Sequence, residues 1–141
     1  MRADSESDLR LVIGHVLLID IVGYSKLLIT EQRQQLQALN EIVRNAAQFR
    51  VSDANGTLVR IPTGDGMALI FRDSVEAPVR CAVEISEAVK THPEIQLRMG
   101  IHSGPVSEVT DVNERTNIAG AGIDIAQRVM DCGAAGHILL S

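Results

Sequence analysis

Two aspartates stand in surroundings where a carboxylate could do chemistry. Asp20 lies inside the nearly continuous apolar run at 15–22 (HVLLIDIV), and Asp65 lies in the glycine-framed sequence TGDG at 63–66. A carboxylate within an apolar strand is costly unless it is paired or bound to a metal ion. Each also has an ordinary interpretation, because polar residues often mark the end of a strand and Asp-Gly is a favoured hairpin turn.

The two aspartates gain significance as a pair, because the elements around them are predicted neighbours. The run at 15–22 has the length and β-branched content of a buried central strand. Short apolar strands at 57–61 and 67–71 flank TGDG as a hairpin. In a split βαβ sheet the first strand adjoins the central hairpin, so both carboxylates could face one small volume. Together with the backbone carbonyl of Ile21, they suit Mg²⁺ or Mn²⁺ carrying the phosphates of a nucleotide.

The remaining patterns complete a β-α-β-β-α-β order followed by a further helix and strand. Apolar residues recur at helical spacing after the first strand, and Asp73 with Glu76 is typical of a capping box that starts the second helix. These later elements are expected at residues 25–50, 73–90, 95–102, 118–130 and 137–140. The order predicts an α+β, ferredoxin-like domain with its helices mainly on one face of the sheet.

Composition indicates one globular domain. The chain has 141 residues, 45% of them hydrophobic, so we expect a flexible tail at 1–12 and a folded domain at 13–141. A net charge of −5 argues against a nucleic-acid binder. No apolar run approaches the ~20 residues of a membrane span, and no signal peptide is evident, so we expect a cytoplasmic location. Cys81 and Cys132 fit two free thiols.

Four segments, taken in order, carry a family resemblance. They are VLLIDIVGYSKL, RIPTGDGMALIF, RMGIHSGPV and NIAGAGIDIAQRVMDCGAAGHILLS. The set resembles the catalytic domain of bacterial-type class III nucleotidyl (adenylate and guanylate) cyclases, whereas the GG(D/E)EF turn of the related diguanylate cyclases is absent. The resemblance covers most of residues 16–141 and implies the cyclase fold, a ferredoxin-like core with an additional helix and strand. It also implies a C-terminally truncated domain, because the family's last hairpin would lie beyond Ser141.

The resemblance assigns roles to four residues. It implies that Asp20 and Asp65, helped by the carbonyl of Ile21, hold two Mg²⁺ or Mn²⁺ ions. One ion would activate the ribose 3′-hydroxyl, and the other would neutralise the triphosphate. Arg128 matches the family's transition-state arginine, a role that suits a guanidinium. Because this arginine and the aspartates belong to opposite protomers in the family, a homodimer is implied.

Three positions depart from the family pattern or leave the base open. Asp124 replaces the asparagine that orients the ribose, and an anion there could instead form an i,i+4 helix salt bridge with Arg128. Ile61, four residues before Asp65, stands where adenylate cyclases usually carry lysine, and it cannot hydrogen-bond a purine. Asn117, at the second base-selecting position, can donate and accept, so it tolerates either base. The predicted substrate is therefore ATP or GTP.

The sequence thus predicts a cyclase that forms a 3′,5′-cyclic monophosphate and pyrophosphate in intracellular signalling, fused to other signalling domains in a longer protein. The alternative, favoured by Asp124 and Ile61, is a degenerate module that binds nucleotide or dimerises without turnover. A structural interaction domain that binds no metal is the third hypothesis. The polar segment at 108–116 is predicted to be a solvated loop or, from the resemblance, a dimer arm. The histidines lack the spacing of metal ligands.

Overall fold

The computed structural model describes residues 9–110, 116–119, 127–128, 130–131, 136 and 138–140. The strands are β1 (Leu9–Ile21), β2 (Leu58–Pro62), β3 (Gly66–Phe71), β4 (Leu97–Thr110), β5 (Thr116–Ala119) and β6 (Ile138–Leu140). The helices are η1 (Tyr24–Lys26), α2 (Ile29–Asn45), α3 (Ala47–Ala54) and α4 (Glu76–Val89). No helix of this part of the chain is long and apolar enough to cross a membrane.

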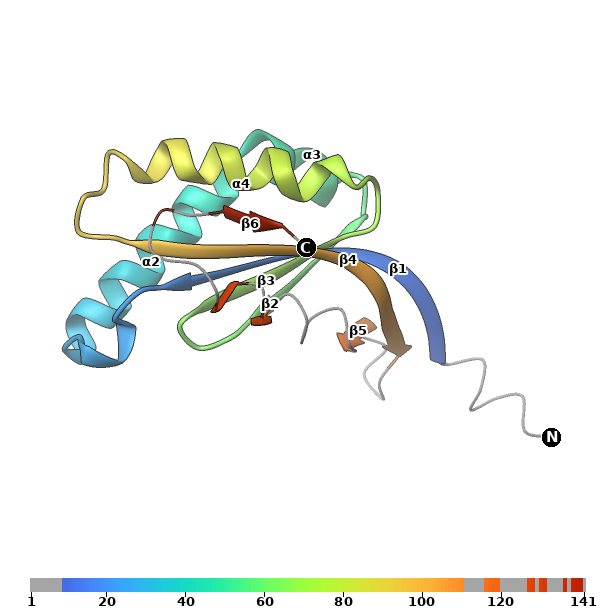
Figure 1. Ribbon diagram of the computed structural model, residues 1–141, viewed down its shortest axis with the longest axis horizontal. Helices are drawn as coiled ribbons and strands as arrows, with labels where there is room; N and C mark the ends of the chain where they lie inside the picture. The colour runs from blue at the N-terminus through green and yellow to red at the C-terminus, as the bar shows by residue number, and fades with distance from the viewer. Residues whose placement is uncertain are drawn as a thin grey trace.

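The strands form one sheet in the order β2-β3-β1-β4-β5. All neighbours along this order are antiparallel, and β6 adds to β4 in parallel. Helices α2, α3 and α4 lie on one side of the sheet (Figure 1). This arrangement is a ferredoxin-like βαββαβ core with added elements. The predicted α+β fold is therefore confirmed.

The alternation of side chains along β1 explains both layers of the core. Leu17, Ile19 and Ile21 belong to the cluster that packs against the helices, whereas Val16 and Leu18 belong to a smaller cluster on the opposite face. Because side chains alternate along a strand, Asp20, two residues after Leu18, belongs to this opposite face. The apolar content of both faces is what makes β1 a central strand.

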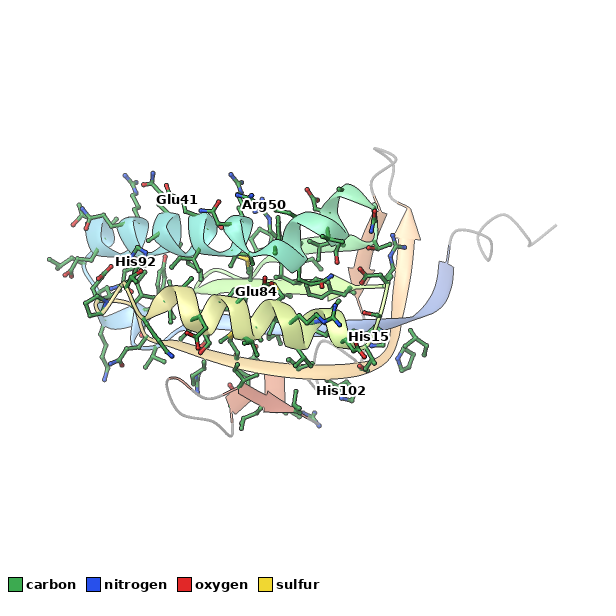
Figure 2. The ribbon with its side chains drawn as sticks, turned by 90° about the horizontal axis from the view of Figure 1, so that it is seen from above. His15, Glu41, Arg50, Glu84, His92 and His102 are labelled. Carbon is green, nitrogen blue, oxygen red and sulfur yellow. The ribbon has the colours of Figure 1, made fainter. Side chains whose placement is uncertain are left out.

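The helical segment predicted at 25–50 is broken into three pieces. It consists of η1, α2 and α3, and Ala46 between the two longer helices has an extended backbone. Glu84, on α4, provides acceptors at this break (Figure 2). Its carboxylate accepts hydrogen bonds from the backbone amides of Ala47 and Gln48, at 3.2 and 3.0 Å. A carboxylate at a helix N-terminus satisfies amides that have no partner within the helix.

The predicted capping box at the start of α4 is wrong. Ser74, rather than Asp73, accepts from the backbone amide of Ala77 at 3.2 Å, and the helix begins at Glu76. Asp73 accepts instead from the hydroxyl of Ser52, at 2.7 Å. Burial alone would raise the pKa of Asp73, but hydrogen bonds, led by that of Ser52, hold the pKa below its ordinary value of 3.8.

Three strand boundaries differ from the prediction. β1 begins at Leu9 and pairs with β4 from its first residue, so 9–12 lie in a strand although a tail was expected there. β4 continues to Thr110, so the predicted loop or arm at 108–116 starts as a strand. β5 contains Ile118 and Ala119, which were expected to begin a helix. Each extension is stabilised by hydrogen bonds to a neighbouring strand, which local residue preferences do not reveal.

Candidate active site

The two predicted aspartates meet where β1 runs alongside the β2–β3 hairpin. Asp20 pairs in register with Gly66, the first residue of β3. The backbone amide of Ile21 donates to the carbonyl oxygen of Asp65 at 2.9 Å, which ties the hairpin to the end of β1. Asp20 is only 6% exposed, and Asp65 is half-buried. The structure therefore brings these aspartates together, as expected from the split βαβ arrangement.

Gly66 makes this close approach possible. A Cβ atom at this position would overlap the carbonyl oxygen of Ile19 and lie 2.8 Å from the Cα of Asp20. Backbone atoms of a central strand cannot move aside without losing their ladder hydrogen bonds. The glycine after Asp65 is thus required by packing, whereas Gly64, with a φ of 92°, has the backbone conformation that the turn needs.

Arg98 is the charged partner of Asp20. The two residues face each other across β1 and β4 in register. Arg98 donates through Nε to Oδ1 of Asp20 at 3.3 Å and through Nη2 to Oδ2 at 3.1 Å. This bidentate contact first, and then the charges of Asp20, Asp131 and Asp65, raise the pKa of Arg98 despite its burial. Asp65 is thus a third carboxylate whose charge acts on Arg98.

A segment near the C-terminus lies against this site. Residues 127–128 and 130–131 are helical, in agreement with the predicted helix at 118–130. Met130 is buried in the cluster on the face opposite α2–α4, where a Cβ atom at Gly100 would lie 2.7 Å from its backbone nitrogen. Asp131 follows, and its Oδ1 is 3.8 Å from Nη2 of Arg98. The guanidinium of Arg98 therefore lies close to two carboxylates, those of Asp20 and Asp131.

The donor set fits a hard divalent cation with an incomplete protein shell. No group of three or more His, Cys, Asp or Glu side chains among the described residues could hold a metal ion. Mg²⁺, however, commonly binds through one or two carboxylates, several waters and the substrate's phosphates. Asp20 is a buried anion whose oxygens contact one cationic side chain in this part of the chain, and Asp65 adds a second carboxylate. With the carbonyl of Ile21 nearby, these residues are suitable ligands for such an ion.

The structure describes fewer contacts for the other predicted site residues. Ile61, in β2, is half-buried and packs against the cluster of Val16, Leu18, Ala68, Ile70 and Met130. Asn117 pairs with Val109 across β4 and β5, and the position of its backbone is all that the structure describes. Arg128 is exposed and makes no hydrogen bond or ion pair with the described residues. Asp124 lies outside the described residues, so its predicted salt bridge is not tested.

The described histidines do not gather at this site. His15 and His102 lie near one end of the sheet, and His92 lies at the other end (Figure 2). His15 shares a 2.7 Å hydrogen bond with Ser103 on the neighbouring strand. His137 lies outside the described residues. The histidines that the structure describes thus form no common metal site.

Comparisons with solved structures matched most of the chain. The catalytic core of a rhodopsin-guanylyl cyclase with converted specificity, in complex with ATPαS, has 22% identity and a TM-score of 0.73, with 96% of this chain and 80% of that chain covered. The guanylate cyclase domain of RhGC from Catenaria anguillulae, in complex with GTP, has 22% identity and a TM-score of 0.71, with 94% and 80% covered. An adenylate/guanylate cyclase/hydrolase from Silicibacter pomeroyi has 25% identity and a TM-score of 0.68, with 94% and 77% covered. Comparisons with protein-family models and with curated proteins gave no match.

The chain has the fold of adenylyl and guanylyl cyclase catalytic domains. The sheet order, the hairpin that carries Asp65 and the helices on one face are therefore features of the cyclase fold. The fold predicted from the four resembling segments is confirmed.

Sequence analysis missed Arg98 and Asp131. The signal for Arg98 was present, because it alternates with the apolar residues Leu97, Met99 and Ile101 of β4 and so belongs to the face opposite α2–α4. Pairing β4 with β1 would have set this cation opposite Asp20. No comparable signal marked Asp131, since its approach to Arg98 depends on how the last helical segment packs.

Proposed function

We propose that the protein is a nucleotide cyclase that converts ATP or GTP to the 3′,5′-cyclic monophosphate and pyrophosphate at a homodimer interface. The observation that carries this proposal is the buried Asp20 beside the Asp65 hairpin, on the face of a cyclase-fold sheet that α2–α4 leave uncovered. Arg98 compensates the charge of Asp20, and a bound cation would also compensate the second carboxylate beside it. The proposed substrates are the cytoplasmic nucleoside triphosphates.

In this mechanism Asp20 and Asp65 would hold two Mg²⁺ or Mn²⁺ ions, with the carbonyl of Ile21 as a further ligand. Bound ions of this kind polarise the 3′-hydroxyl and neutralise the charge of the triphosphate. The hydrogen bond between Ile21 and Asp65 keeps the two carboxylate-bearing segments at a fixed separation. Positioning and charge stabilisation account for most catalysis of phosphoryl transfer, so this rigidity supports the assignment.

Arg128 would act on the site of the partner protomer. Its side chain is exposed, so a second copy of the chain could contact it. A guanidinium can contact the α-phosphoryl oxygens as negative charge develops on them.

The proposal leaves open whether the substrate is ATP or GTP. Ile61 offers an apolar surface, which both purines can contact, and Asn117 would supply the polar contact to the base. The Catenaria domain was solved with GTP, and the rhodopsin-guanylyl cyclase core solved with ATPαS has converted specificity. The fold thus accommodates either purine once its specificity is changed, and the preference of this chain is to be measured with both.

The test is production of cyclic nucleotide from ATP and from GTP with Mn²⁺, followed by chromatography. We expect the wild-type protein to form product from at least one nucleotide, and Asp65→Asn to lower the rate by about 100-fold or more. Asp53→Asn, an exposed carboxylate change on α3, is the matched control and should retain wild-type turnover. Full turnover by Asp65→Asn would contradict the proposed site.

A second candidate function is a cyclase-fold module that binds nucleotide or dimerises without turnover. It is favoured by Asp124, which replaces the ribose-orienting asparagine implied by the family resemblance. In that case the wild type would bind Mn²⁺ and nucleotide but form no product. Gain of turnover in Asp124→Asn would then identify that side chain as the cause.

A further inference from the structure

Arg98 occupies both oxygens of the carboxylate that the proposed cation needs. Its Nε and Nη2 contact Oδ1 and Oδ2 of Asp20 at 3.3 and 3.1 Å. The side chain of Asp20 is 9% exposed, so solvent does little to stabilise its charge. The guanidinium therefore neutralises Asp20 in the way that a bound cation would.

A second carboxylate lies near the same nitrogen of Arg98 that contacts Asp20. Oδ1 of Asp131 is 3.8 Å from Nη2, just outside hydrogen-bond distance. Gln127 donates to the same Oδ1 at 2.9 Å, which holds the carboxylate in place. Asp131 is 52% exposed and Arg98 is 30% exposed, so the guanidinium can turn toward solvent without burying a new charge.

We propose that Arg98 competes with the divalent cation for Asp20 and that Asp131 is the acceptor to which Arg98 turns when the cation binds. This inference rests on the proposed metal site of the cyclase. The groups around the guanidinium are the carboxylates of Asp20, Asp65 and Asp131, from three different segments. A dication on Asp20 would repel a guanidinium on the same two oxygens, whereas Asp131 offers an anion farther from the ion. Arg98 thereby neutralises the charge of Asp20 before the cation arrives.

The exchange predicts opposite effects on metal affinity at two positions. Arg98→Met keeps the aliphatic stem but removes the competing charge, so the Kd for Mn²⁺ should fall by about tenfold. Asp131→Asn removes the alternative acceptor and leaves Arg98 on Asp20, so the Kd for Mn²⁺ should rise by about threefold. Arg80→Met is the matched control, because Arg80 forms an exposed ion pair with Glu76 at 3.0 Å. Its Kd should equal that of the wild type.

The experiment is a Mn²⁺ titration monitored by the electron paramagnetic resonance signal of the free ion, without nucleotide. Circular dichroism first establishes that each variant is folded. If Arg98→Met does not fold, the Kd of Asp131→Asn for Mn²⁺ tests the exchange by itself. Weaker Mn²⁺ binding by Arg98→Met would overturn the exchange and make Arg98 a support that positions Asp20. An unchanged Kd in Asp131→Asn would overturn the role of the second acceptor.

The outcomes separate this inference from the proposed function. A wild type that binds Mn²⁺ and shows both shifts, yet forms no cyclic nucleotide, would support the exchange and contradict turnover. A wild type that binds no Mn²⁺ would contradict the proposed metal site. Binding that then appears in Arg98→Met would still support competition by the guanidinium, and its absence would overturn the inference.

Discussion

Gly66 provides a stringent test of how the two aspartates are brought together. Gly66→Ala would introduce a Cβ atom that overlaps the carbonyl oxygen of Ile19 and lies 2.8 Å from the Cα of Asp20. Both are backbone atoms of the central strand, and Asp20 is held from its other side by Arg98 on β4. The strand pair must therefore separate locally to admit one methyl group.

The expected cost follows from the nature of these neighbours. Overpacking a core costs about 1–3 kcal/mol when side chains absorb the strain, so we expect about 3 kcal/mol where only backbone can move. Gly64→Ala, in the same hairpin, is the matched control because a Cβ atom there meets nothing within 4 Å. Its φ of 92° makes alanine unfavourable by about 1 kcal/mol. The two variants should thus differ by about 2 kcal/mol.

Urea unfolding monitored by circular dichroism measures both costs as differences in the free energy of unfolding. Mn²⁺ titration of the same proteins adds a functional measurement, and Gly66→Ala should bind the ion more weakly than Gly64→Ala. A Gly66→Ala protein that is as stable as the Gly64→Ala control would refute the close approach of β1 and β3 at this residue.

Two further predictions concern α3 and α4. In urea unfolding, Glu84→Ala should lower the free energy of unfolding by about 1 kcal/mol, because two backbone amides lose their acceptor. Glu87→Ala removes only an exposed ion pair and should change this free energy by less than about 0.5 kcal/mol. The hydrogen bond from Ser52 helps hold the pKa of Asp73 below its value in the unfolded chain, so its stabilisation is present above about pH 4 and is lost as the pH falls further. Thermal unfolding should therefore show that the stability gap between wild type and Asp73→Asn narrows below pH 4, whereas Asp53→Asn should show no such narrowing.

Features encoded in contiguous residues were predictable from the sequence. The apolar run containing Asp20 and the TGDG hairpin each carry a local signal, and the known order of a split βαβ sheet makes them neighbours. The meeting of Asp20 and Asp65 could therefore be expected before any coordinates. The extended start of β1 at Leu9 could not, because residues 9–12 form a strand only by pairing with the far end of the long strand β4.

Contacts that depend on strand register or on the packing of later segments were not predicted. The break at Ala46 is accompanied by contacts from Glu84, which lies 37 residues after the first amide that it accepts from. Arg98 faces Asp20 because of the β1–β4 register, and Asp131 approaches Arg98 because Met130 packs against Gly100. Single-sequence patterns report periodicity within a segment, whereas these contacts arise from tertiary packing.

The most direct test of the central claim asks whether Asp65 of one protomer works with Arg128 of the other. Asp65→Asn and Arg128→Ala should each abolish cyclic nucleotide formation alone. Co-expressed in equal amounts, half of the dimers would be mixed and each would hold one intact site, so we expect about a quarter of wild-type activity. A mixture as inactive as either variant alone, with an active wild type, would contradict an active site shared between two protomers.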